Sequence, residues 1–275
     1  MQSSIIKSGL GQTMFDHFIR NLLLRRGLFV SKLTDDDQVK ALVAKLKPHE
    51  TDKQLIRVGG EKDGGYLVPD DLQGVEYCFS PGVAKTVAFE MDLAARGIRS
   101  FLADYSVDGP PVNSQMFHFE KRFLGAVDND MVMTLETWIK KSIPNCAQDL
   151  ILQMDIEGSE YDVILSTPDS VWRRFRIVVI EFHSLHSAFN SFGLRLIDHC
   201  FNRLLKIFDV VHIHPNNILP PLKRNSVEIP GVMEMTFLRK DRVKWRKPSA
   251  NFPHPLDHPN IADKPNVVLP ASWYR

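Results

Sequence analysis

Seven short apolar segments lie in the middle of the chain, and most of them alternate with segments of helical periodicity. Runs that are apolar at almost every position are typical of strands buried on both faces, as in a parallel sheet covered by helices. No helical pattern separates the last two segments, which predicts that these two strands pair antiparallel at one edge. The chain is therefore predicted to be an α/β protein with a doubly wound, mostly parallel seven-stranded sheet and an antiparallel last strand. We expect the strands at 75–82, 98–104, 118–127, 150–155, 175–183, 208–214 and 231–240.

The sheet-forming core is predicted to span residues 71–246, with a further segment on either side. Residues 1–70 are expected to form an N-terminal helical or lid segment. Residues 247–275 contain six prolines, which exclude regular helix through most of this tail. Its interleaved apolar residues predict an extended path across the domain or a neighbouring subunit. Within the core, helices are expected at 86–97, 134–143, 159–167 and 187–206.

Composition narrows the class of protein. The chain has 275 residues, 44% of them hydrophobic, so it can bury a full core as one domain. Its 34 Lys and Arg residues nearly balance 33 Asp and Glu residues, and this balance argues against nucleic acid as a partner. Three cysteines without C-x-x-C spacing favour a reducing, cytoplasmic setting.

One N-terminal segment, residues 13–30, combines an apolar stripe with three arginines. Such a helix packs on its own domain or on a second subunit of a homo-oligomer, and the alternative is peripheral contact with a membrane surface. No apolar run approaches the length of a transmembrane span, and no signal peptide is expected at the N-terminus.

Polar side chains follow nearly every predicted strand. In open α/β sheets, ligands bind outside the carboxyl ends of the strands, so these residues are the candidates for a site. Charged groups at such positions are costly unless they are solvated or paired, and a purely structural sheet does not require them. The candidates from this rule are Ser80, Gly82, Asp104, Tyr105, Asp128, Asp155, Glu181, His183, His212, His214 and Asn216.

The first two strands carry a pattern typical of nucleotide binding. Gly82 ends the first strand, and Asp104 follows the second strand 22 residues later. A carboxylate about 20 residues beyond a glycine turn accepts hydrogen bonds from ribose hydroxyls in such folds. The segment "SPGVAKT" has one glycine where a dinucleotide fingerprint has three, which disfavours a nicotinamide cofactor. A turn glycine and a solvated acid without any ligand remain the alternative for this pair.

The combined motifs resemble the FkbM-like family of S-adenosylmethionine (SAM)-dependent O-methyltransferases. The resemblance rests on "LILQMDIEGSEYDVIL" (150–165), supported by "IVVIEFH" (177–183), "TLETWI" (134–139) and "RVGGEKDGGYLVP" (57–69), and covers roughly residues 55–240. It implies a Rossmann-like class I methyltransferase fold, SAM as cofactor and a hydroxyl as methyl acceptor. The glycine loop after the first strand is thinner than in most SAM enzymes.

If the chain binds SAM, the strand-end residues and the glycine-rich segment divide into a cofactor side and an acceptor side. Ser80, Gly82, Asp104, Tyr105 and Asp128 are expected at the cofactor. In the glycine-rich segment, Arg57 is expected at the carboxylate of the methionine moiety and Asp63 at its amine, unless the segment is only a connecting hairpin or loop. His212 and Asn216 are expected at a small-molecule or glycan acceptor.

The chemistry of methyl transfer to a hydroxyl leaves two interpretations open. Asp155, Glu181 and His183 form a donor set suited to Mg²⁺ or Mn²⁺, which would lower the pKa of the acceptor hydroxyl. Alternatively, Asp155 orients the hydroxyl, and His183 or His214 acts as the general base. Glu157 is expected beside the pocket, and Glu160 is expected to serve the following helix.

The preferred function is methyl transfer from SAM to a hydroxyl of a sugar, a glycan or a secondary metabolite, an acceptor class carried by the resemblance alone. Two alternatives remain: a nicotinamide-dependent enzyme with a Rossmann-like fold, and a non-catalytic scaffold that keeps the methyltransferase fold.

Overall fold

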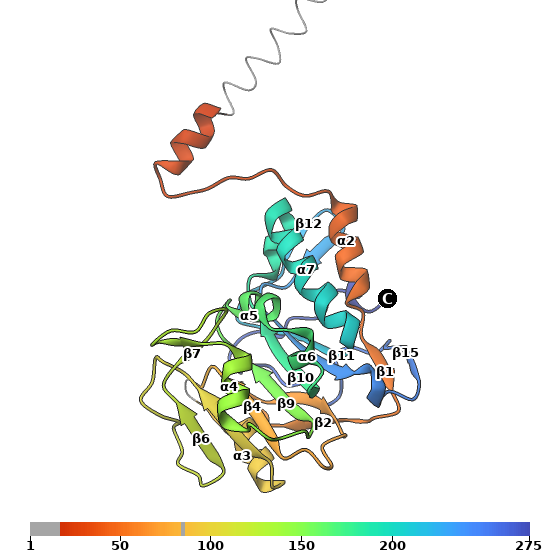
Figure 1. Cartoon of the computed structure of the whole chain (residues 1–275). Coiled ribbons are helices and arrows are strands. Elements are labelled where there is room, and N and C mark those ends of the chain that lie inside the picture. Colours follow the sequence, from red (N-terminus) through yellow and green to blue (C-terminus); the bar gives the residue numbers. More distant parts are fainter. Residues whose placement is uncertain (1–16, 84–85) are drawn as a thin grey trace, which may run out of the picture.

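A seven-stranded sheet forms the centre of the computed structural model, which describes residues 17–83 and 86–275 (Figure 1). All neighbouring strands are parallel except for β14, which is antiparallel to both of its neighbours. This topology confirms the predicted fold, with the antiparallel pair at one edge. In spatial order the strands are β11 (Phe208–Pro215), β14 (Met233–Arg239), β10 (Phe175–Phe182), β9 (Leu150–Met154), β4 (Tyr77–Pro81), β5 (Arg99–Ala103) and β6 (Phe117–Glu120).

Some of the helices begin at residues whose side chains cap them. The side chain of Thr134 accepts a hydrogen bond from the amide of Thr137 and starts α4, and Asn190 caps α7 in the same way through Gly193. The helix expected at 187–206 is therefore divided at Asn190, with a 3₁₀ turn, η1 (Leu185–Phe189), before α7. The α-helices are α2 (Asp36–Lys45), α3 (Ala88–Ala95), α4 (Leu135–Ser142), α5 (Glu160–Ser166), α6 (Asp169–Trp172) and α7 (Ser191–Ile207).

The strand expected at 118–127 is also divided. β6 ends at Glu120, and β7 (Phe123–Leu124) leaves the sheet to pair with β8 (Val132–Met133). The two charged residues between them, Lys121 and Arg122, break the apolar alternation and form the turn.

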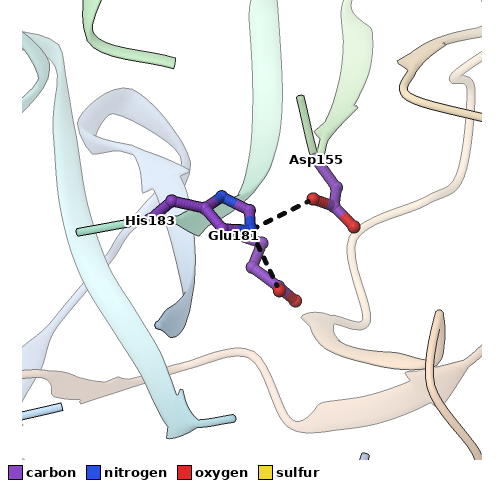
Figure 2. A group of neighbouring side chains, drawn as sticks. All are labelled: Asp155, Glu181 and His183. Carbon is purple, nitrogen blue, oxygen red and sulfur yellow. Dashed lines mark ion pairs between the residues drawn. The ribbon is translucent and has the colours of Figure 1, made fainter. Parts of the chain in front are cut away.

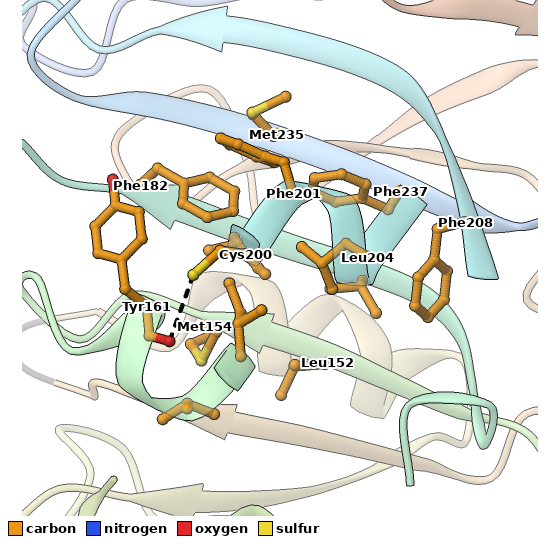
Figure 3. Packing of buried hydrophobic residues seen from close by; sticks show 14 of the residues in the cluster. Leu152, Met154, Tyr161, Phe182, Cys200, Phe201, Leu204, Phe208, Met235 and Phe237 are labelled. Carbon is orange, nitrogen blue, oxygen red and sulfur yellow. Dashed lines mark hydrogen bonds between the residues drawn. The ribbon is translucent and has the colours of Figure 1, made fainter. Parts of the chain in front are cut away.

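The two faces of the sheet are covered differently. On one face, α4 to α7 bury the larger core, in which Phe201 of α7 packs 4.7 Å, between ring centroids, from Phe182 of β10 (Figure 3). The opposite face is covered by α3 and by a hairpin of β2 (Leu55–Val58) and β3 (Tyr66–Pro69). Helices on both faces were expected; part of the second face carries the hairpin instead.

The hairpin is fastened directly over the antiparallel end of the sheet. The hydroxyl of Thr236 in β14 donates a hydrogen bond of 2.7 Å to the carbonyl of Leu67 in β3. The glycine-rich loop at residues 59–65 connects the two strands of this hairpin, next to the carboxyl edge of the sheet. This arrangement places the loop within reach of the strand ends where a site was expected.

The Pro-rich tail packs on the chain's own domain. It starts with β15 (Arg246–Pro248), which pairs with β1 (His49–Thr51), and ends with the buried indole of Trp273, whose Nε1 donates to the carbonyl of Glu228 at 3.0 Å. A separate small hairpin joins β12 (Leu222–Arg224) to β13 (Val227–Ile229). Between β15 and Trp273, the tail crosses the end of β11 and brings polar residues to the carboxyl edge.

Residues 17–24 form a helix that extends away from the domain (Figure 1). Its apolar side chains are exposed, with Phe18 at 66% and Leu22 at 44%, so the described residues do not pack on the chain's own domain as expected. Residues 13–16 of the predicted stripe lie outside the described residues. Contact with a second subunit or a membrane surface stays a prediction, and no described helix is long and apolar enough to span a bilayer.

Candidate functional site

A row of three carboxylates and one imidazole crosses four neighbouring strands at the carboxyl edge of the sheet. Glu181 of β10 is directly opposite Glu234 of β14, and Glu234 is directly opposite His214 of β11. Asp155 follows β9, the other neighbour of β10. Residues directly opposite each other project to the same face of a sheet, which here is the face covered by the β2–β3 hairpin. We call Asp155, Glu181, Glu234 and His214 the acidic row.

His183 joins the acidic row from just beyond β10. Its Nε2 lies 3.9 Å from Oδ1 of Asp155 and 3.7 Å from Oε1 of Glu181 (Figure 2). One potential ligand atom from each of the three side chains lies within 4.8 Å of the others. The structure thus brings together the three residues that were predicted to hold a metal ion.

The turn after β9 explains how His183 is oriented. Glu157 and Gly158 adopt positive φ angles of 56° and 104°, and Oε1 of Glu160 accepts hydrogen bonds from the amides of Ile156 and Gly158 at 3.2 and 3.1 Å. The same oxygen lies 3.0 Å from Nδ1 of His183. Donation of the Nδ1 proton to Glu160 leaves the Nε2 lone pair facing the acids, as in many metal-binding histidines. Glu160 therefore orients a site residue as well as beginning α5.

Burial perturbs the acids of this cluster. It raises the pKa of Asp155 to about 7, against the opposing effect of the His183 charge. Burial, together with the charges of Asp155 and Glu234, raises the pKa of Glu181 well above its usual range. Burial tends to lower the pKa of His183, but the bond to Glu160 and the neighbouring carboxylates raise it on balance. Ionising all of these groups together costs free energy unless a cation or bound protons compensate their charges.

A further observation supports a divalent cation at Asp155, Glu181 and His183. Oδ1 of Asp155 and Oε2 of Glu181 are buried and have no hydrogen-bond partner among the described residues. Unsatisfied buried carboxylate oxygens are rare in folded proteins, and Mg²⁺ or Mn²⁺ would satisfy them.

The two predicted acceptor residues, both buried, have different partners. The side-chain amide of Asn216 donates to Oε1 of Glu181 at 3.2 Å, so Asn216 is part of the site and positions an acid. His212 is instead tied to the tail, with Nε2 2.9 Å from Oδ1 of Asp257. Substrate contact by either residue stays a prediction.

His214 is the second candidate base. Its Nδ1 lies 3.7 Å from Asp257, and its Nε2 is buried without a partner among the described residues. Burial tends to lower the pKa of His214, but the carboxylates of Asp257 and Glu234 raise it on balance. His212 and His214 together hold the pKa of Asp257 below its usual range, although burial opposes this.

The predicted cofactor side begins with a glycine that no other residue can replace. Gly82 has a φ of 95°, and a Cβ atom there would lie 1.6 Å from the carbonyl oxygen of Asp155. The backbone at Gly82, after β4, therefore lies directly against the backbone of Asp155, after β9. Asp104, at the end of β5, accepts hydrogen bonds from the amide and hydroxyl of Ser106 through Oδ1, at 2.7 and 2.6 Å. These bonds orient the carboxylate at the strand end, and its expected role at a ribose stays a prediction.

Two other predicted cofactor residues already make hydrogen bonds to neighbouring side chains or amides. The Ser80 hydroxyl is buried between Glu90 and Gln153, which leaves its backbone for any ligand. Asp128 accepts hydrogen bonds from Thr134 and Thr137 and so stabilises the start of α4. Cofactor binding by Ser80 and Asp128 stays a prediction.

Tyr105 and Arg57 complete the predicted cofactor set. Tyr105 is 38% exposed beside the ring of Phe123 and remains available to a ligand. The guanidinium of Arg57 donates to backbone carbonyls of its own hairpin and, at 3.2 Å, to Leu256 of the tail. Its expected role at the cofactor carboxylate is untested.

Sequence reasoning did not identify three residues of the site: Glu234, Asp257 and Asn260. Glu234 had a signal, because the alternation in "VMEMTFL" places an acid on the face of β14 that also carries Thr236 and Leu238. Asp257 and Asn260 had none, because they lie in an irregular tail and meet their partners His212 and Glu234 at 45 and 26 positions along the chain, without any periodic pattern.

Comparison with known proteins supports the resemblance that the motifs indicated. Residues 96–211 match the methyltransferase FkbM domain, a stretch that contains Asp104, Asp155, Glu181 and His183 and stops before His214 and Glu234. A comparison with curated proteins gave no match. The match favours a methyltransferase over a nicotinamide-dependent enzyme. This match over residues 96–211 supports an FkbM-like methyltransferase.

Proposed function

We propose that the chain is a SAM-dependent O-methyltransferase assisted by a divalent cation. The observation that carries the proposal is the acidic row with His183, at the carboxyl edge beside Gly82 and the Asp155 carbonyl. An alcohol is a poor nucleophile at neutral pH, so the enzyme must remove or weaken its proton while it aligns the oxygen with a methyl donor. The methyl group would come from the sulfonium of bound SAM.

The proposed division of labour follows the two sides of the edge. Asp104 accepts hydrogen bonds from the ribose, and Gly82 lets the backbone of the first loop approach the cofactor. Asp155, Glu181 and Nε2 of His183 hold Mg²⁺ or Mn²⁺, which lowers the pKa of an acceptor hydroxyl. Glu160 keeps the imidazole in the ligating orientation.

The acceptor proton needs a destination. His214 is the proposed general base, because its Nε2 is buried and unpartnered among the described residues, and His214 lies directly opposite Glu234 on the neighbouring strand. In the alternative, the neutral form of His183 takes the proton without a cation. The choice between them is decided by whether methyl transfer requires added Mn²⁺.

The proposed acceptor is a hydroxyl of a sugar, a glycan or a secondary metabolite. Oxygen-rich acceptors suit the polar surroundings that Asn216, Asn260 and the acidic row provide. The acceptor class itself rests on the family resemblance.

Calorimetric titration with SAM and with its demethylated product tests the cofactor assignment. Wild-type protein is expected to bind either compound with micromolar affinity, and Asp104→Ala is expected to weaken binding about tenfold or more because the ribose acceptor is lost. Asp108→Ala is the matched control, since that carboxylate is exposed in the following loop and pairs with Lys121. Absence of binding to the wild-type protein would refute the proposal.

A further inference from the structure

A second group of acids lies on the other side of Glu181. Asp63 of the glycine-rich loop, Glu181 of β10 and Glu234 of β14 each offer one oxygen atom, and these atoms lie within 4.8 Å of one another. Glu181 belongs to both this group and the group with Asp155 and His183. The two groups thus meet at one shared carboxylate.

Burial makes this second group expensive without a positive charge. The Glu181 and Glu234 side chains face each other from neighbouring strands, and the residues are only 5% and 6% exposed. Oε2 of Glu181 is buried and has no partner among the described residues. No Lys or Arg among the described residues forms an ion pair with Asp63, Glu181 or Glu234. Unpaired buried charges cost several kcal/mol in general, so a cation or protons must compensate them.

The tail holds the second group in shape. The side-chain amide of Asn260 donates to Oδ1 of Asp63 at 3.0 Å and to Oε1 of Glu234 at 2.5 Å. Its own Oδ1 is buried and unpartnered among the described residues. Asp63 is exposed on its hairpin loop, which leaves a path from solvent. Oxygen-only donors of this kind are those preferred by Mg²⁺ and Mn²⁺.

We propose that Asp63, Glu181 and Glu234 bind a second divalent cation, with Glu181 bridging it to the cation held by Asp155, Glu181 and His183. The proposal rests on the proposed function only for the first of these two cations. Paired divalent ions that share a carboxylate recur where an enzyme must bind and polarise neighbouring oxygen atoms. The second cation would lie nearer to His214, because His214 is directly opposite Glu234.

Binding of Mn²⁺ to the metal-free full-length chain at pH 8 tests the proposal, with calorimetry for stoichiometry and electron paramagnetic resonance for coupling between ions. Wild type is expected to bind two Mn²⁺ per chain and to show exchange coupling between them. Asp63→Asn and Glu234→Gln are each expected to weaken one of the two sites at least about tenfold and to remove the coupling.

Glu61→Gln is the matched control, because Glu61 is an exposed acid two residues from Asp63 on the same loop, and it should keep two coupled ions. Asp63→Asn serves as the decisive variant if Glu234→Gln does not fold, since Asp63 is exposed. One ion per wild-type chain, or two coupled ions in Asp63→Asn, overturns the proposal. Titration with the demethylated cofactor product tests the proposed function separately. If the chain binds that product normally but binds only one Mn²⁺, the second cation is rejected and the proposed function is not.

Discussion

The two halves of the sheet's carboxyl edge treat their acids in opposite ways. At β4 and β5, Asp104 is satisfied by Ser106, and nearby Asp128 is satisfied by Thr134 and Thr137, all within ten residues along the chain. At β9, β10 and β14, Asp155 and Glu181 keep buried oxygens without partners among the described residues. The first half is complete as folded, whereas the second half requires a cation or protons.

This contrast separates two kinds of binding. A pre-oriented carboxylate such as Asp104 binds a ligand at little cost in reorganisation. Buried acids with raised pKa values lower the free energy of unfolding when they are ionised. A cation that binds them in the folded state raises it again. The following variants and conditions break or sharpen the contrast, beginning with the largest expected effect.

Gly82→Ala would break the junction between the two halves. The new Cβ would collide with the Asp155 carbonyl, 1.6 Å away, and the backbone has a φ of 95°. We expect a loss of more than about 3 kcal/mol in the free energy of unfolding and no measurable cofactor binding. Gly97→Ala has a similar φ of 80° and no neighbour within 4 Å of the new atom, so it should cost only about 1 kcal/mol. Equal losses in urea denaturation would contradict the steric explanation.

Glu181→Gln would make the second half resemble the first. The glutamine side chain keeps the shape of Glu181 and an oxygen that accepts from Asn216. It removes the buried carboxyl group, whose pKa is raised by burial. At pH 8 the metal-free variant is expected to be more stable than wild type by roughly 1–2 kcal/mol, and to lose stabilisation by Mn²⁺. Urea denaturation with and without Mn²⁺ measures both effects. A less stable metal-free variant would show that the carboxylate is not under strain.

A change of pH should affect the stability contributed by the second half, through Asp155. Asp155 has a folded-state pKa of about 7, above its unfolded value, so its stabilising contribution is complete below the unfolded pKa and is lost as pH rises through 7. From pH 6 to pH 8 this group is expected to cost the metal-free protein roughly 1 kcal/mol. Mn²⁺ competes with that proton, so its shift of the melting temperature should be larger at pH 8. A larger shift at pH 6 would exclude Asp155 as a ligand.

Asp128→Asn should have the smallest effect and distinguishes a helix cap from a cofactor ligand. The variant loses hydroxyl hydrogen bonds from Thr134 and Thr137 at an exposed position, so about 0.5 kcal/mol of stability should be lost. Cofactor affinity should remain that of Asp130→Asn, the control at an exposed acid nearby. A tenfold weaker cofactor affinity with unchanged stability would instead support the predicted cofactor role.

The sheet could be predicted because its strands are specified locally. The nearly continuous apolar runs at 150–154 and 175–182 predicted β9 and β10 to within one residue. Once parallel order is assumed, Asp155, Glu181 and His183 must converge, since the carboxyl ends of neighbouring strands meet at one edge. The prediction that helices cover both faces was only partly correct, because a two-stranded hairpin can bury the apolar surface of a sheet as well as a helix does.

The rest of the site depends on contacts that no local pattern encodes. Glu234 reaches the carboxyl edge only because β14 runs antiparallel, so its first residues lie where the other strands end. Glu160 could be assigned to α5 from the helix pattern, but its contact with His183 follows from how the turn after β9 folds. Asp257 and Asn260 are placed by a Pro-rich path without periodicity.

The attachment of the tail has a consequence for the order in which the protein folds. Asn260 is 197 positions from Asp63 along the chain, and Leu256 is 199 positions from Arg57. Contacts of such separation form late, because the intervening chain must first be ordered. The sheet can therefore be in place while residues 254–260 are still detached, and the contacts of Asn260 with Asp63 and Glu234 would then be completed last.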